Sequence, residues 1–264
     1  MKHVVVASSL MLSTAAFADV IPPPPAAPAP APAAEVPASD PLREAFVLVD
    51  TGPNTVPTLQ KAIALYEGAL SDVSRSAKDR AAGWADLSRA YMRLGDLYKN
   101  DKEKIATYEK GKAAGEKAVE VAGGKHADGR FWATANLAVI GRTRGVMNSL
   151  FMLGDLRKGM NEVLAMDPNY HLARNTLGEI DHAVPGLAGG SDDRAEKAYL
   201  EVLKRDPRFT ATMLLLAKLK RDQGKTDEAR QWAQKVIAET SPTMRHDHKK
   251  FDVPDAKAII AELK

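Results

Sequence analysis

Side chains that could bind a metal ion gather near the C-terminus, where His246 and His248 stand close to Asp247 and Asp252. Imidazole nitrogens and carboxylate oxygens are common zinc ligands, and a structural zinc site needs four of them in tetrahedral geometry. The spacing of these residues is that of a loop, in which no regular element fixes a third and a fourth ligand. We therefore interpret this segment as a solvated tail, and we predict no metal site and no cofactor.

Catalytic motifs are not recognisable in the sequence. It contains no nucleophile elbow, no phosphate-binding loop, no HExxH motif and no grouping of Ser, His and Asp. Asp192 and Asp193 are adjacent carboxylates, but they follow a Gly-Gly loop at the expected start of a helix. Acidic residues there complement the helix dipole, so we interpret them as a helix start and not as an acid/base pair. We predict no catalytic residue and no enzymatic activity.

Composition favours an all-α protein of one or two domains. The chain has 264 residues, of which 45% are hydrophobic, so it can bury a sizeable core. Its 37 basic and 34 acidic residues are interspersed and give a net charge of +3, so the sequence has no basic patch of the kind that binds nucleic acid. Ala, Leu, Lys, Glu and Arg dominate the middle of the chain and favour helix. There is no cysteine to form a disulfide or a thiolate metal site.

The N-terminus has the pattern of a targeting segment followed by a linker. Residues 1–18 combine a short basic start, an apolar run and the small-x-small site Ala16-Phe17-Ala18, which predicts a signal peptide cleaved after Ala18. Residues 19–41 are rich in Pro and Ala and predict a spacer or a disordered tail, with a proline-rich ligand as a third alternative. Residues 42–264 form the predicted folded domain. We expect a periplasmic or secreted protein with no membrane span after cleavage.

The elements of that domain repeat. Between His171 and Glu239 two helix pairs carry small and apolar residues in the same order. Leu177-Gly178 correspond to Leu216-Ala217, and the second helices share the positions Ala195, Tyr199, Val202 and Ala229, Ala233, Val236. This spacing is that of tetratricopeptide (TPR) repeats, whose period is about 34 residues. Small residues where two helices cross allow close packing. The sequence therefore predicts a superhelix of TPR-like helical hairpins.

Further helices are expected on both sides of this stretch. We predict helices at 42–49, 58–72, 102–122, 128–145, 155–166 and 254–263, and a bent or short helical piece at 147–153. Another helix begins near Lys78; its Trp84, Leu87 and Tyr91 match the large positions of a first TPR helix, and Gly95 is predicted to mark its turn.

Five segments together resemble one family. They are YEKGKAAGEKAVEVA at 108–122, FWATANL at 131–137, LRKGMNEVLAMDPNYHLARNTLGEI at 156–180, VPGLAGG at 184–190 and RAEKAYLEVLKRDP at 194–207. In this order they resemble the TatT family, the T-component of TRAP-type periplasmic transporters. The resemblance implies a periplasmic helical scaffold that pairs with a substrate-binding protein and helps to pass small, often hydrophobic, ligands. Many relatives carry a lipobox cysteine, whereas Ala18-Asp19 stand at that place here.

We predict that the first helices of the hairpins form a partner or ligand surface. Its candidates are the aromatic and Asn residues of those helices and the inserted loop: Tyr91, Phe131, Trp132, Asn136, Phe151, Asn175, Pro185, Gly186, Gly189 and Gly190. For Phe131 and Trp132 core packing is the favoured interpretation. Asn136 and Asn148 lie in apolar surroundings; a buried Asn needs hydrogen-bond partners, and helix–loop bonds are favoured over ligand contacts.

Two functions fit these observations. The first is a non-catalytic scaffold for another periplasmic protein, with a hydrophobic small molecule as a further ligand. The alternative is a carrier that binds a lipid or other hydrophobic ligand itself. Four methionines between 147 and 166 motivate the carrier, because methionine adapts to irregular apolar ligands, although it is also an ordinary core residue.

Overall fold

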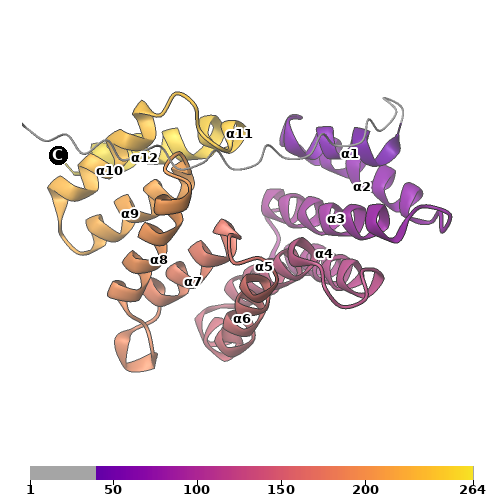
Figure 1. The fold of residues 1–264 in the computed structure, drawn as a ribbon, viewed down its shortest axis with the longest axis horizontal. Coiled ribbons are helices and arrows are strands. Elements are labelled where there is room, and N and C mark those ends of the chain that lie inside the picture. Colours follow the sequence, from indigo (N-terminus) through magenta and orange to yellow (C-terminus); the bar gives the residue numbers. More distant parts are fainter. Residues whose placement is uncertain (1–39, 264) are drawn as a thin grey trace, which may run out of the picture. The chain divides into compact units, whose positions relative to one another are not determined.

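The structure is a computed structural model that describes residues 40–263, which belong to one compact unit. Every regular element in this range is a helix (Figure 1). In chain order they are α1 (Pro41–Asp50), α2 (Val56–Leu70), α3 (Ala77–Leu97), α4 (Asp101–Val121), α5 (Ala127–Arg144), α6 (Val146–Met166), α7 (His171–Ala183), η1 (Gly186–Ala188), α8 (Asp192–Arg205), α9 (Thr210–Asp222), α10 (Thr226–Ala238), α11 (Arg245–Asp247), η2 (His248–Asp252) and α12 (Val253–Glu262). The all-α prediction is confirmed.

The predicted signal peptide, residues 1–18, and nearly all of the predicted linker lie outside the described residues. Within residues 40–263, no helix combines the length and the apolar character that crossing a membrane requires.

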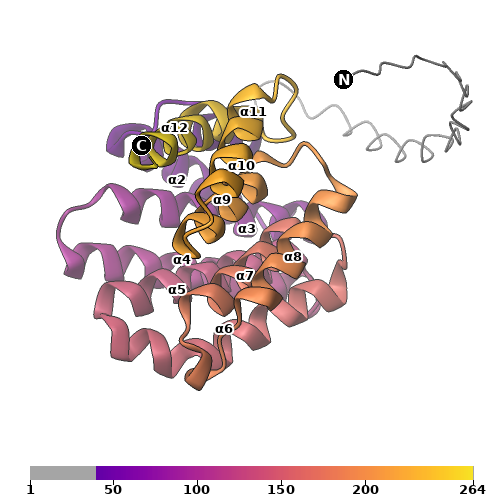
Figure 2. The same ribbon diagram turned by 90° about the vertical axis from the view of Figure 1, so that its left-hand side faces the viewer.

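Consecutive helices pack against one another as the repeat pattern predicts. α3 packs on α4, α4 on α5, α5 on α6, α7 on α8 and α9 on α10. Figure 2 shows the helices from α2 to α6 following one another in chain order. Side-chain caps define several starts: Ser76 accepts from the Asp79 amide before α3, Asn100 from the amides of the first turn of α4, and Ser191 from the Arg194 amide before α8.

Small residues lie at the helix crossings. A Cβ atom on Gly178 of α7 would stand 2.5 Å from the Tyr199 ring of α8, so only glycine permits this approach. The α4–α5 crossing is built in the same way, because a Cβ on Gly115 would stand 2.7 Å from the backbone oxygen of Gly129. The prediction that small side chains let the hairpins nest is confirmed.

Two boundary predictions were wrong. Gly95 does not mark the turn after α3: it is a buried residue inside the helix, where the Tyr108 ring of α4 packs on it, and the helix ends two residues later. The residues from 147 to 166 do not form two pieces but one helix, α6. Gly154 lies in its interior with open space around it, and a helix tolerates one exposed glycine at a cost of about 1 kcal/mol.

The predicted solvated tail was also wrong. His248 and Asp252 are buried, and the Thr210 hydroxyl donates to the Asp252 carboxylate at 2.7 Å. Thr243 donates to Asp206, and Asp247 lies 3.5 Å from the Arg93 guanidinium of α3. Polar composition suggested a solvated segment, but Asp252, Thr243 and Asp247 each have a protein partner. The segment therefore packs on α9 and leads into α12.

Candidate partner-binding groove

A groove runs between α2 and α4, with α3 as its floor. In the ribbon, α2 and α4 lie on opposite sides of α3 (Figure 1). The groove encloses about 550 Å³ and is lined by Glu67, Leu70, Ser71, Trp84, Leu87, Tyr91, Lys110, Ala113, Ala114 and Lys117. A second depression of about 260 Å³ continues it toward Leu94 and Tyr98, and the two share Glu67, Tyr91 and Lys110.

The groove follows from the sequence of α3 and α4. Trp84, Leu87 and Tyr91 stand three and four residues apart, so they share one face of α3 and form the floor. The middle of the α4 wall is formed by Ala113 and Ala114. Because their side chains are single methyl groups, they leave the space above the α3 floor open. In the described chain α2 and α4 both pack on α3 but make no substantial contact with each other.

The charged groups of the groove stand on its walls. The Tyr91 hydroxyl on the floor donates to the Glu67 carboxylate on the α2 wall, and burial together with Glu67 raises the pKa of Tyr91 above its usual value. Tyr91 therefore stays a neutral donor at ordinary pH. On the other wall, the Lys110 ammonium lies 5.9 Å from the centroid of the Tyr91 ring, and Lys117 pairs with Glu120 at 2.7 Å. The groove therefore offers apolar area between the charged groups of Glu67, Lys110 and Lys117.

Of the predicted surface residues, Tyr91 is in this groove. Phe131 is buried, and its ring packs on Trp132 at 4.9 Å and on Tyr170 at 5.1 Å between centroids. Trp132 is half-buried against the same cluster. The favoured interpretation, core packing, describes both residues, and neither of them lines the groove.

Asn136 and Asn175 are not surface residues, which corrects the prediction. Asn136 is fully buried, and its Nδ2 donates to the Ser88 carbonyl oxygen at 3.2 Å and to the Trp132 carbonyl oxygen at 2.9 Å. Asn175 exchanges hydrogen bonds of 2.9 and 3.0 Å with the Thr212 hydroxyl. Their partners are helices and not loops: Asn136 ties α5 to α3, and Asn175 ties α7 to α9.

Asn148 was predicted to lie in apolar surroundings, but it is exposed and donates to the Arg144 carbonyl oxygen one turn earlier. Phe151 is also exposed on α6, with 80% of its area accessible, but it does not line the groove.

The inserted loop after α7 is folded onto itself. Pro185, Gly186 and Gly189 are exposed, whereas Gly190 is half-buried and its amide donates to the Pro185 carbonyl oxygen at 3.2 Å. Gly189 has φ of 91°, a backbone conformation that favours glycine. Arg194 of α8 donates to the Gly189 carbonyl oxygen and to Asp181 of α7. These bonds fix the loop to the ends of two helices, away from the α2–α4 groove.

Sequence reasoning missed the α4 wall of the groove. Lys110, Ala113, Ala114 and Lys117 follow the spacing of one helix face, with two small residues between two long ones. Charge pattern alone predicts only a solvated face for the lysines of this region. The alanines were the available signal, because two small residues on a face that does not pack closely against a neighbour leave a depression.

Comparisons with known proteins support the fold and go no further. No protein-family model matches the chain, and no curated protein matches it. A solved structure, of a thermophilic TPR protein from Thermus thermophilus, matches with a TM-score of 0.62 and 17% sequence identity. The match covers 84% of this chain and 96% of that chain. The fold of the chain is therefore that of a TPR-like helical repeat.

Proposed function

We propose that the chain is a non-catalytic scaffold that holds an apolar segment of a partner protein in the α2–α4 groove. The observation that carries the proposal is the floor of this groove, where Trp84, Leu87 and Tyr91 stand in a row between two helices. Trp and Tyr are over-represented among residues that dominate binding energy, especially in partly enclosed depressions. A TPR-like stack generally provides such surfaces for protein recognition.

The finer part of the proposal concerns place and partner. The apolar N-terminal run, the site before Asp19 and the resemblance to TRAP T-components support a periplasmic protein that acts with a substrate-binding protein in transport of a small ligand.

The experiment compares two arginine substitutions on the same helix. Ala113 and Ala106 are both exposed residues of α4, but only Ala113 lines the groove. Wild type, Ala113→Arg and Ala106→Arg would each be used to capture partners from a cell-envelope extract, with quantitative mass spectrometry. We expect a substrate-binding protein that the wild type and Ala106→Arg retain and Ala113→Arg loses. Equal recovery by all three variants would show that the groove is not the docking surface.

A second candidate function is a carrier for a hydrophobic small molecule. The volume of the groove, about 550 Å³, favours it, because small-molecule sites commonly measure about 300–1,000 Å³. Native mass spectrometry of the purified chain separates the two functions. A carrier retains or takes up palmitate as a probe in a one-to-one complex that Ala113→Arg weakens, whereas a pure protein scaffold shows the bare mass.

A further inference from the structure

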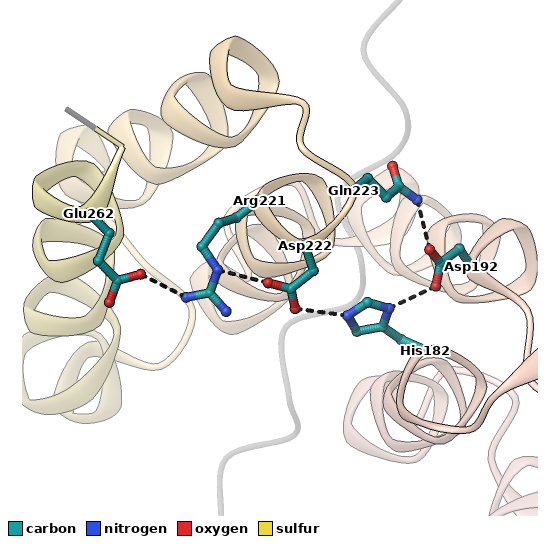
Figure 3. A network of polar contacts seen from close by, with 6 residues as sticks. All are labelled: His182, Asp192, Arg221, Asp222, Gln223 and Glu262. Carbon is teal, nitrogen blue, oxygen red and sulfur yellow. Dashed lines mark hydrogen bonds and ion pairs between the residues drawn. The ribbon is translucent and has the colours of Figure 1, made fainter.

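His182 lies between two carboxylates that belong to two other helices. It is the penultimate residue of α7, and its Nδ1 is 2.7 Å from Asp192 at the first position of α8. Its Nε2 is 3.1 Å from Asp222 at the last position of α9. Figure 3 shows the ring between these two side chains. One imidazole therefore links three helices that come from two successive hairpins.

The surrounding charges are paired within the same network. The second oxygen of Asp192 accepts from Gln223 at 3.3 Å, and the second oxygen of Asp222 accepts from Arg221 at 2.8 Å (Figure 3). Arg221 also pairs with Glu262 of α12 at 3.1 Å. From α6, Arg157 pairs with Asp181 and not with His182. The charged groups that face the ring are thus the two carboxylates, and the network reaches from α7 to α12.

The chemistry of imidazole makes this arrangement depend on a proton. A neutral imidazole carries one N–H, whereas the imidazolium cation carries two. Both contacts are hydrogen bonds only when the ring is charged; the neutral ring turns a lone pair toward one carboxylate. Burial alone lowers the pKa of His182, but the hydrogen bonds to Asp192 and Asp222 and their charges outweigh it and raise the pKa above its usual value.

We propose that His182 is a proton-dependent tie that holds α9 to the α7–α8 hairpin and releases it as the pH rises. The contact to Asp192 is the shorter, so the neutral ring keeps its proton on Nδ1 and the contact to Asp222 is lost. Because the folded-state pKa lies above the unfolded one, the stabilisation is complete below about pH 6.5 and disappears as the pH passes the folded-state pKa. The α8–α9 packing remains, so the hairpins loosen without separating.

The test joins two measurements on the full chain. NMR of histidine labelled with ¹³C gives the pKa of His182, whose signal is identified by its loss in His182→Gln. Hydrogen exchange gives the protection factors of the amides from Gln223 to Lys225, at the end of α9 and the turn that follows it. The pKa of His182 should be higher in the closed state than in the opened state, and each unit of this difference changes the opening equilibrium tenfold. We expect protection to fall by that factor as the pH rises through the pKa of His182.

The control is His171, which lies on the same helix but packs its ring on Phe209, 5.3 Å between centroids. Burial lowers the pKa of His171, so its titration falls at a different pH. The pH step in protection should persist in His171→Gln and vanish in His182→Gln. A pKa of His182 at or below 6.5, or a step that persists in His182→Gln, would overturn the proposal.

Discussion

Gly115 offers a quantitative test of close helix packing. It lies where α4 crosses α5, and an added Cβ would stand 2.7 Å from both the Ala133 amide nitrogen and the Gly129 carbonyl oxygen. These are backbone atoms, which cannot move aside as the end of a flexible side chain can. The Gly115→Ala substitution must therefore push the two helices apart.

Two opposing effects set the magnitude. Alanine favours a helix interior over glycine by about 1 kcal/mol. Overpacking a close contact costs about 1–3 kcal/mol. Gly154 in α6 and Gly68 in α2 are matched controls, because an added Cβ meets nothing within 4 Å at either place. The Gly115→Ala variant should lie about 1–3 kcal/mol below the Gly154→Ala variant in free energy of unfolding, since the shared propensity gain cancels.

The assay is urea unfolding followed by circular dichroism at the helix band. Repeat proteins need not unfold in one step, so all variants are fitted with one shared m value, the slope of the unfolding free energy against urea concentration, and are compared by their midpoints. Gly154→Ala and Gly68→Ala should stabilise the protein. If Gly115→Ala stabilised it as much as the controls do, the inferred close contact between α4 and α5 would be refuted.

Two further predictions concern polar side chains, one buried and one half-buried. Asn175→Leu leaves the buried Thr212 hydroxyl without its partner and should lower the free energy of unfolding by about 1–3 kcal/mol. Adding Thr212→Val should recover most of this loss. Urea unfolding of the two single variants and the double variant checks this, and strictly additive effects would contradict it. Burial raises the pKa of Asp86 to about 6. Its ionisation therefore destabilises the fold as the pH rises from about 4 to 6. Asp86→Asn should raise the free energy of unfolding by on the order of 2 kcal/mol at pH 7 and leave it unchanged near pH 3.5, in the same assay. An equal effect at both pH values would exclude this cause.

The helical hairpins could be predicted because their signal is local. The positions of Gly178, Tyr199 and Val202 have counterparts at the same spacing in the next hairpin, and such spacing decides which faces meet in a nearest-neighbour stack. Helix ends were less predictable, because glycine has two uses. Gly95 permits the approach of the Tyr108 ring inside α3, whereas Gly224, with φ of 72°, ends the α9 region in a left-handed turn.

The candidate groove could not be predicted, because it exists where α2 and α4 do not contact each other. Tyr91 was chosen as a large residue of a first helix, but the space above it is open only because Ala113 and Ala114 face it. Asn136 and Asn175 show the opposite limit: an Asn among apolar residues indicates burial with partners, and the partners, Ser88 and Thr212, stand 48 and 37 positions away.

The most direct measurement of the central proposal is calorimetric titration of the purified partner against three forms of the chain. With wild type as reference, Ala113→Arg should weaken binding by about 30-fold or more, because an arginine fills the space that the partner's apolar segment would occupy and a dominant contact contributes about 2 kcal/mol. Ala106→Arg, on the same helix but outside the groove, should bind within about threefold of wild type. Equal dissociation constants for Ala113→Arg and wild type would contradict recognition through the α2–α4 groove.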